Sequence, residues 1–195
     1  MAADYIVIFV EGETEKEFYR ELLNYYRSKQ SHSLKAFRII DIRGITRFEN
    51  KMGLIVQNDI LKKYDAGKVH IICCHDTDVF DFARKPPVDW VRVKNRMNRL
   101  GIGHFEQVKA KRMIEDWFIM DVDGLCKFLK LKAPKKMEGK DGYDKIKKLF
   151  KMGGKIYIKG TYSQKFIPHL DMALVRIHAQ VELEKLEKAL GVKIK

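Results

Sequence analysis

The chain has 195 residues, of which 46% are hydrophobic and 33% are charged. This length predicts one domain, or one domain with a small appendage, and this composition excludes a disordered chain. No apolar run approaches the roughly 20 residues of a membrane helix, so we expect no membrane partner. The first residues lack the basic and apolar regions of a signal peptide, and the three cysteines lack the spacing of a zinc site or a disulfide framework. We therefore expect a cytoplasmic protein.

The positive charge is concentrated in one part of the chain. The formal net charge is +13, and the stretch from Lys127 to Lys165 alone holds 13 basic and 3 acidic residues. Residues 1–126 hold 21 basic and 19 acidic residues and are nearly neutral. An uneven basic surface indicates a polyanionic partner, with nucleic acid ahead of a membrane surface. A lysine-rich surface that only keeps the protein in solution explains the charge equally well.

Buried strands alternate with amphipathic helices through the first half of the chain. Tyr5–Val10 is almost wholly apolar, which is typical of a strand covered on both faces, and Thr14 and Glu17 form a capping box for the next helix. The predicted strands cover residues 5–10, 37–42, 69–74 and 104–108, and the predicted helices cover residues 14–28, 48–63 and 88–100. This alternation predicts an α/β fold with a mostly parallel four-stranded sheet flanked by helices.

The second half of the chain has a helical pattern. Helices are predicted over residues 113–131, with a break at Asp123 and Gly124, over residues 143–150, and over residues 170–190 as one long helix. A polar, lysine-rich connection covers residues 132–142. We therefore expect an α/β core over residues 1–112 and a helical, lysine-rich extension over residues 113–195 that packs on this core.

Acidic side chains follow two of the predicted strands. Glu11 comes directly after the first strand, and Asp76 and Asp78 follow the strand that begins at Val69. Sites in open parallel sheets form at the carboxyl ends of the strands, and two residues that are two apart in extended backbone point to the same side. Glu15 lies one helical turn beyond Glu11 and is placed to reach the same space.

Carboxylates that are brought together repel one another unless a cation lies between them or protons are taken up. Oxygen ligands of this kind suit Mg²⁺ or Mn²⁺, which activate a nucleophile and stabilise charge on a phosphate. Each residue also has a simpler explanation, because aspartates favour turns and glutamates favour the first turn of a helix. Their joint placement after two buried strands favours a shared metal site.

The acidic motifs resemble those of the Toprim domain, which topoisomerases, bacterial primases, OLD-family nucleases and small ribonucleases share. The resemblance rests on residues 10–15, with their Glu-Gly-x-x-Glu form, and on Asp76-Thr77-Asp78 after an apolar strand. Residues 114–121 are similar to a Glu-x-Trp-(Leu/Phe)-x-x-Asp signature of small stand-alone Toprim proteins, including RloB-like ones. Residues 140–143 and 157–159 are similar to the C-terminal pattern of that group.

This resemblance implies a Toprim-like core and one or two Mg²⁺ or Mn²⁺ ions. It assigns Glu11 as a metal ligand or general acid/base, and Asp76 and Asp78 as the metal-binding pair. Glu15 matches a ligand of a first metal, and Glu115 matches an acidic position that completes a second metal site.

The resemblance and the basic residues together predict how a phosphate is held. Lys159 matches a late lysine that neutralises the scissile phosphate, so it joins Glu11, Asp76 and Asp78 as a predicted catalytic residue. The predicted nucleic-acid-binding residues are Arg43, Arg47, Arg112 and Lys155.

These features predict a metal-dependent nuclease that hydrolyses DNA or RNA, and the resemblance adds a setting in phage defence. OLD-family nucleases carry an ATPase domain that does not fit in this chain, so any such partner is a separately encoded ATPase. The alternatives are a Toprim module that binds nucleic acid or regulates a partner without catalysis, and a nucleotidyl transferase. The oligomeric state is left open.

Overall fold

A computed structural model describes residues 5–194 and contains one sheet of four strands. The strands are β1 (Tyr5–Val10), β2 (Ala36–Asp41), β3 (Val69–Asp76) and β4 (His104–Ala110). Their order in the sheet is β2-β1-β3-β4, and all three neighbouring pairs are parallel. The predicted α/β class, with a parallel four-stranded sheet flanked by helices, is therefore confirmed. The two strands with continuous apolar sequences, β1 and β3, are the central ones, as burial on both faces requires.

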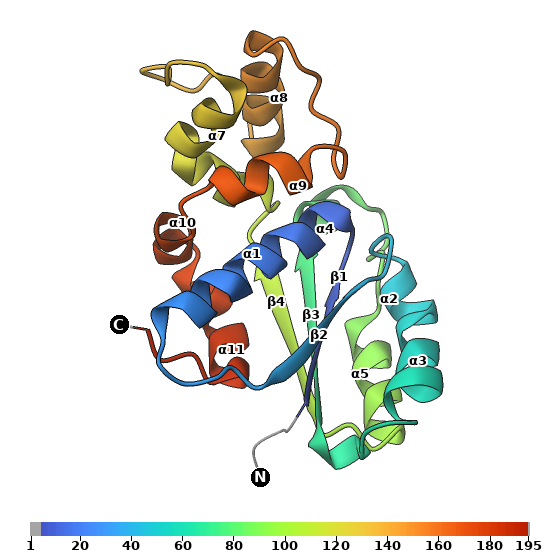
Figure 1. Ribbon diagram of the computed structural model, residues 1–195. Helices are drawn as coiled ribbons and strands as arrows, with labels where there is room; N and C mark the ends of the chain where they lie inside the picture. Colours follow the sequence, from blue (N-terminus) through green and yellow to red (C-terminus); the bar gives the residue numbers. More distant parts are fainter. Residues whose placement is uncertain (1–4, 195) are drawn as a thin grey trace.

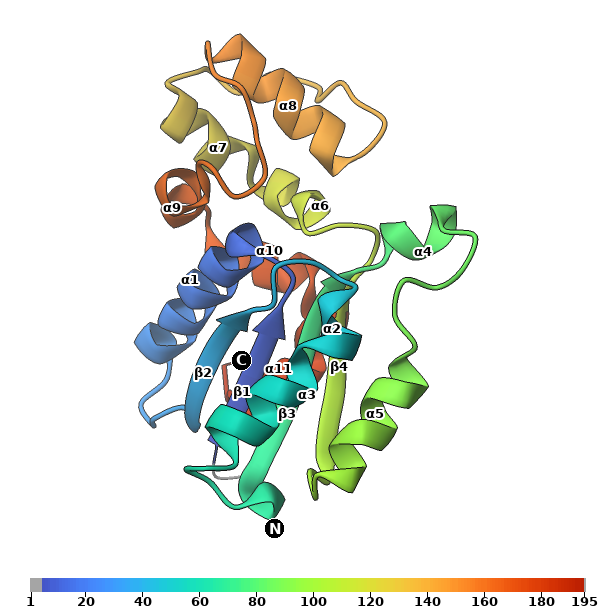
Figure 2. The same ribbon diagram turned by 90° about the vertical axis from the view of Figure 1, so that its right-hand side faces the viewer.

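Helices cover both faces of this sheet (Figures 1 and 2). One face lies against α1 (Glu13–Lys29), α10 (Met172–His178) and α11 (Gln180–Leu190). The other face is covered by α2 (Arg47–Asn50), α3 (Met52–Ile55), a π-helical turn (Val56–Ile60) and α5 (Trp90–Arg99). Successive strand residues alternate between these two layers, so Cys73 and Cys74 lie in different cores. No described helix combines the length and the apolar character that crossing a membrane requires.

A helical lobe stands beyond the carboxyl ends of the strands (Figure 1). It contains α6 (Glu115–Phe118), a 3-10 turn (Ile119–Asp121), α7 (Val122–Leu129), α8 (Gly142–Met152), α9 (Ser163–Phe166) and a second 3-10 turn (Ile167–His169). Its core is continuous with the face of the sheet under α1, because the ring of Phe18 contacts those of Trp117 and Phe118. The chain then returns through α10 and α11 to the sheet. The boundary at residue 112 stays a prediction, and one apolar core runs across it.

Several predicted elements differ in the structure, including the helix predicted over residues 48–63, which forms α2, α3 and the π-helical turn. The strand that ends at Asp76 is followed at once by α4 (Asp78–Phe82), so the backbone is not extended through residue 78. The long helix predicted over residues 170–190 is two helices that meet at Ala179, where the backbone leaves helical geometry (ψ 15°). Arg176 in the first helix donates two hydrogen bonds to Glu187 in the second, which fixes the bend.

The break in residues 113–131 lies at the 3-10 turn of Ile119–Asp121 and not at Gly124, which is helical. Asp121 caps α7, because its Oδ1 accepts a hydrogen bond from the Gly124 amide at 2.9 Å. Its Oδ2 accepts from the Asp171 amide at 2.6 Å, so one buried carboxylate joins the lobe to the start of α10. A side chain at position 124 would collide with Asp121, which explains a glycine inside this helix.

This double role of Asp121 gives a test of the lobe. Replacing Asp121 with Ala leaves two amides without their acceptor, and we expect a loss of about 1–3 kcal/mol in the free energy of unfolding. Asp123→Ala removes an exposed carboxylate from the same helix and should change it by no more than about 0.5 kcal/mol. Denaturant unfolding of both variants measures the difference. Equal stability of the two variants would contradict the role assigned to Asp121.

Candidate active site

Two carboxylates meet where the central strands end. Glu11 directly follows β1, and Asp76 is the last residue of β3, the neighbouring strand. The backbone amide of Asp76 donates a hydrogen bond to Oε1 of Glu11 at 2.8 Å. Gly12 then turns the chain into α1, whose first turn carries Glu15. The parallel topology thus brings together Glu11, Glu15 and Asp76, three of the four residues that the sequence pattern placed at this edge.

Lys159 lies at the centre of this acidic group. Its Nζ is 2.9 Å from Oδ2 of Asp76, 2.9 Å from Oε1 of Glu15 and 3.8 Å from Oε2 of Glu115. The side chains of these three acidic residues are buried, with 6%, 3% and 2% of their surface exposed. We call Glu11, Glu15, Asp76, Glu115 and Lys159 the carboxylate–lysine cluster.

Three further hydrogen bonds hold the cluster in place. The Tyr157 hydroxyl donates to Oε1 of Glu115 at 2.9 Å, and the Gly160 amide donates to Oγ1 of Thr14 at 2.6 Å. The Ile114 amide donates to Oδ1 of Asp76 at 2.9 Å. The segment from residue 157 to residue 160 is therefore fastened on both sides of Lys159, to α6 and to the first turn of α1.

The electrostatics of the cluster follow from burial. Desolvation raises the pKa of Glu11 to about 7. The hydrogen bond from the Asp76 amide lowers this pKa, and the nearby charge of Glu15 raises it further. Desolvation also raises the pKa of Asp76 and that of Glu115, although Lys159 opposes both shifts. Burial by itself would lower the pKa of Lys159, but the surrounding carboxylates outweigh it and raise this pKa. Four carboxylates thus share one ammonium group, and the site favours additional positive charge or protons.

Asp78 reaches the site by a different route from the predicted one. Its amide and that of Thr77 donate to the carbonyl of Arg112, at 2.9 and 2.8 Å, and the Arg112 amide donates back to Oγ1 of Thr77. This turn places Asp78 in the first turn of α4, where its Oδ1 accepts from the Val79 amide at 2.8 Å. The expectation that extended backbone aligns Asp76 with Asp78 was wrong. Asp78 lines a hollow together with Asp76 without touching Lys159.

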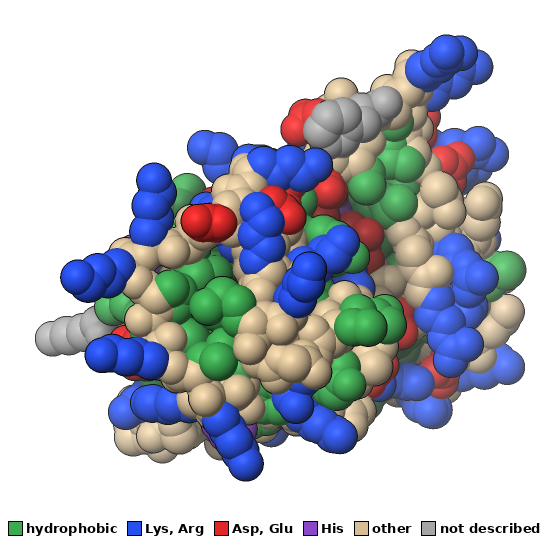
Figure 3. Space-filling model, turned by 90° about the horizontal axis from the view of Figure 1, so that it is seen from above, with side chains coloured by type: hydrophobic (Ala, Val, Ile, Leu, Met, Phe, Trp, Pro, Cys, Tyr) green, Lys and Arg blue, Asp and Glu red, His purple; other side chains and the backbone are tan. Residues whose placement is uncertain are grey.

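Two hollows flank Lys159, which lines both of them. One has a volume of about 400 Å³ and includes Glu11, Glu15, Asp41 and Arg43 in its walls. The other has a volume of about 530 Å³, and its lining residues include Asp76, Asp78, Asp81, Arg112, Glu115, Lys140 and Tyr143. Figure 3 views this end of the molecule, where acidic side chains gather in a recess and basic side chains project around it.

The predicted phosphate-binding residues do not all lie at these hollows. Arg43 lines the first hollow and Arg112 the second, and both have positive φ angles, of 63° and 68°. Arg47 is exposed in the first turn of α2. Lys155 lines neither hollow. It directly follows the turn that ends α8, and its amide donates to the carbonyl of Phe150.

Sequence reasoning gave no role at the site to Tyr157 or Thr14, and His75 was not among the predicted site residues. Tyr157 donates to Glu115, and Thr14 accepts a hydrogen bond from the Gly160 amide of the Lys159 segment. The predicted capping box was wrong, because Thr14 lies inside α1, whose N-cap is Gly12. The one available signal for Tyr157 was the family pattern over residues 157–159, because Ile156 and Ile158 are equally apolar and yet exposed, whereas Tyr157 is buried. His75, next to Asp76, is buried and stacks on Trp90 with ring centroids 4.5 Å apart.

The cluster has the donor chemistry of a divalent-cation site, but Lys159 fills its centre. Among residues 5–194, no three His, Cys, Asp or Glu side chains are arranged so that they could hold a metal ion. The donors are all carboxylate oxygens, and the partner of the buried Oε1 of Glu15 is the Lys159 ammonium, 2.9 Å away. An ion about 2.1 Å from this atom and from Asp76 would overlap the Lys159 ammonium. The residues therefore fit Mg²⁺ or Mn²⁺ in chemistry once Lys159 withdraws.

No protein-family model matches the chain, and no curated protein matches it. Among solved structures, the C-terminal region of the Xanthomonas campestris pv. campestris OLD protein is similar, with a TM-score of 0.44 and 14% sequence identity over 95% of each chain. A likeness at this level shows neither a family nor an activity.

The raised pKa of Glu11 gives a pH test. Its folded value of about 7 lies above the ordinary 4.5, so the folded protein holds an extra proton between these pH values. The free energy of unfolding therefore falls as the pH rises through this window. Glu11→Gln keeps an acceptor for the Asp76 amide and removes the charge, so its melting temperature relative to wild type should rise from pH 5 to pH 8.

Glu138→Gln is the matched control, because Glu138 is an exposed carboxylate on the lobe. Thermal unfolding of wild type, Glu11→Gln and Glu138→Gln from pH 5 to pH 8 measures whether Glu11 titrates in this range. A pH-independent difference between Glu11→Gln and wild type would show that Glu11 does not titrate in this window.

Proposed function

We propose that the protein is a metal-dependent nuclease that hydrolyses phosphodiester bonds in DNA or RNA. The observation that carries the proposal is the convergence of four carboxylates and one lysine at the carboxyl ends of the central strands. This edge is where open parallel sheets place their active sites. The raised pKa values of Glu11, Asp76 and Glu115 support a site whose chemistry requires a cation.

The side chains divide into ligands and proton carriers in this proposal. Glu11, Glu15 and Asp76 would hold Mg²⁺ or Mn²⁺, with Asp78 and Glu115 available for a second ion. Such an ion, when bound, lowers the pKa of a water molecule and neutralises charge on the phosphate. Alternatively, Glu11 does not bind the ion, and with its pKa of about 7 it then accepts a proton from the attacking water. Lys159, once it leaves the carboxylates, provides a positive charge for the scissile phosphate.

The surroundings of the site suit a polyanionic substrate. Arg43 and Arg112 line the two hollows beside Lys159, and Arg47 lies on the adjoining turn. The net charge of +13 adds attraction at long range. A role in phage defence and a separately encoded ATPase partner belong to the proposal through the sequence resemblance alone.

One observation favours a second candidate, a nucleic-acid-binding or partner-regulating module without catalysis. The Lys159 ammonium already lies within 2.9 Å of two carboxylates, so the cluster has an internal counter-ion. In this alternative the ion pairs only stabilise the lobe on the sheet. Binding of nucleic acid would then be sensitive to salt, but no divalent ion would produce turnover.

Substitution of Asp76 separates the two candidates. Asp76→Asn keeps an acceptor for the Ile114 amide and removes the charge, and we expect it to reduce cleavage by at least about 100-fold. Purified protein is incubated with single- and double-stranded DNA and RNA in Mg²⁺, Mn²⁺ or EDTA, and labelled nucleotides report nucleotidyl transfer.

Asp65→Asn, an exposed change just before β3 at the opposite edge of the sheet, is the control and should cleave as wild type does. Cleavage by Asp76→Asn at the wild-type rate would overturn the proposal. Salt-sensitive binding by wild type with no cleavage in any ion would favour the binding module.

Replacement of Lys159 tests the cation site without an activity readout. Lys159→Met removes the positive charge from three buried carboxylates, so we expect a lower melting temperature in EDTA at pH 7.5. Mg²⁺ or Mn²⁺ should restore stability in this variant more than it stabilises wild type, because the centre of the cluster is vacated. Lys140→Met, an exposed lysine at the second hollow, should show neither effect. A divalent ion that stabilises Lys159→Met no more than the control would contradict a metal site here.

A further inference from the structure

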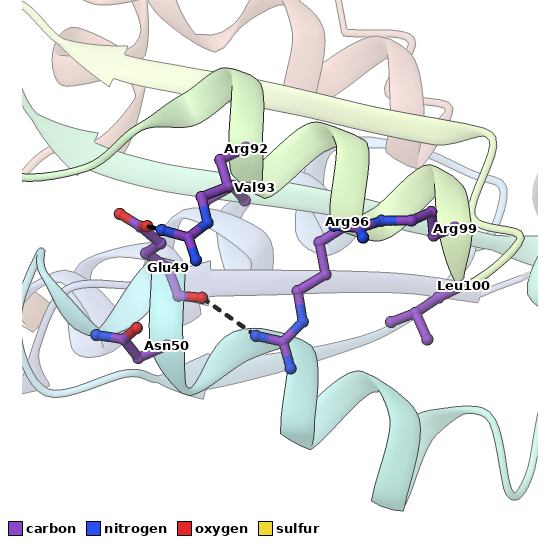
Figure 4. Close-up of a pocket in the computed structure, with 7 residues that line it drawn as sticks. All are labelled: Glu49, Asn50, Arg92, Val93, Arg96, Arg99 and Leu100. Carbon is purple, nitrogen blue, oxygen red and sulfur yellow. Dashed lines mark hydrogen bonds and ion pairs between the residues drawn. The ribbon is translucent and has the colours of Figure 1, made fainter.

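A third hollow lies on the other face of the sheet, between α5 and the pair α2 and α3 (Figure 4). It has a volume of about 400 Å³ and is lined by Glu49, Asn50, Arg92, Val93, Arg96, Arg99 and Leu100. Three of these residues are arginines at helical spacing, so they share one side of α5. We call this hollow the arginine groove. The proposed nuclease chemistry leaves it unexplained.

Two of the three guanidinium groups are held in place. Nη1 of Arg92 donates to Oε1 of Glu49 at 2.8 Å, and Nη1 of Arg96 donates to the carbonyl of Glu49 at 3.3 Å. Arg96 lies across Gly53, where any side chain would collide with its guanidinium. A glycine at this point of α3 therefore clears the space that Arg96 occupies.

The groove has an excess of positive charge. Arg99 is exposed and forms no ion pair with any residue in the described part of the chain, so one carboxylate faces three guanidinium groups. A solvated helix face explains the exposed Lys94 on the opposite side of α5. It does not explain why guanidinium groups gather in a hollow, where their mutual repulsion favours an anion.

The groove begins near the candidate active site. α5 starts at Trp90, whose ring stacks on His75, the neighbour of Asp76. α2 starts at Arg47, just after the turn that carries Arg43. With a rise of 1.5 Å per residue, the step from Arg92 to Arg99 takes the arginines about 10 Å along α5, away from the strand ends.

We propose that the arginine groove binds the sugar–phosphate backbone of the nucleic-acid strand that enters or leaves the active site. Guanidinium groups match phosphate oxygens in shape and charge, and contacts to the backbone position a strand without reading its sequence. Arg96 provides a fixed contact and Arg99 a free one, while Glu49 orients Arg92. This inference rests on the proposed function for the identity of the strand, and it names the path that the strand takes.

Binding measured in EDTA tests the groove separately from cleavage. Fluorescence anisotropy with labelled single-stranded and duplex oligonucleotides gives the affinity at several salt concentrations. Two lost phosphate contacts should weaken binding by the Arg96→Gln/Arg99→Gln variant about tenfold. Loss of these contacts should also make the negative slope of log affinity against log salt shallower, by about 1.4 for a single strand and about 1.8 for a duplex. Arg99→Gln alone, which removes an exposed side chain without an ion pair, should give about half of each effect.

Lys94→Gln is the matched control, because it removes one positive charge from the opposite side of the same helix. It should leave affinity and salt slope nearly unchanged. Equal effects of Lys94→Gln and Arg99→Gln would overturn the groove as a specific path, and so would wild-type affinity in the double variant. If inorganic phosphate raises the melting temperature of wild type but not of the double variant, while both bind the oligonucleotide equally, the groove takes a free phosphate and the proposal fails.

The outcomes also separate this inference from the proposed function. Cleavage by wild type together with unchanged binding in the double variant would leave the nuclease standing and remove the groove. Binding through the groove with no cleavage in any divalent ion would keep the groove and remove the nuclease. Absence of oligonucleotide binding by wild type at low salt would overturn both.

Discussion

The ion pairs of Lys159 with Glu15 and Asp76 are the interaction on which this structure depends. Carboxylates at the ends of parallel strands are separated by little more than the strand spacing, and burial makes their charges costly. A single ammonium group compensates them, and it comes from a segment that follows α8, far along the chain. The lobe is therefore more than an addition to the sheet, because it supplies the charge that the strand ends require.

The topology explains why these groups meet and why basic residues surround them. With β1 and β3 adjacent and parallel, the turns that follow them share one edge of the sheet, and the lobe covers part of that edge. The helices on the far face begin at the same edge, so the arginines of α5 form a line that leads away from it. The carboxylates, the lysine and the start of the groove thus all lie at the carboxyl ends of the strands.

Local rules predicted the strand ends well and the long-range partners poorly. Glu11 and Asp76 were placed correctly because continuous apolar strands and parallel pairing fix where strands end. Asp78 was misplaced, since the Thr77 turn depends on hydrogen bonds with Arg112, which no local pattern reveals. The break at Ala179 was missed because both flanking helices have the same apolar period. Tyr157 and Lys159 were visible only as a family pattern, because their contacts with Glu115 and Asp76 depend on how the lobe folds over the sheet.

If the carboxylates hold the proposed cation, the Lys159 segment also links its binding to the contact between the lobe and the sheet. Asp76 and Glu15 belong to the sheet and its first helix, whereas Lys159 and Tyr157 arrive from the lobe side. Any cation that takes the place of the ammonium group releases one of the bonds between the two parts. By thermodynamic reciprocity, if the proposed cation weakens the contact between the lobe and the sheet by some factor, loosening that contact would strengthen cation binding by the same factor. In the proposed function, the affinity of the site for an ion would thereby depend on how closely the lobe packs on the sheet.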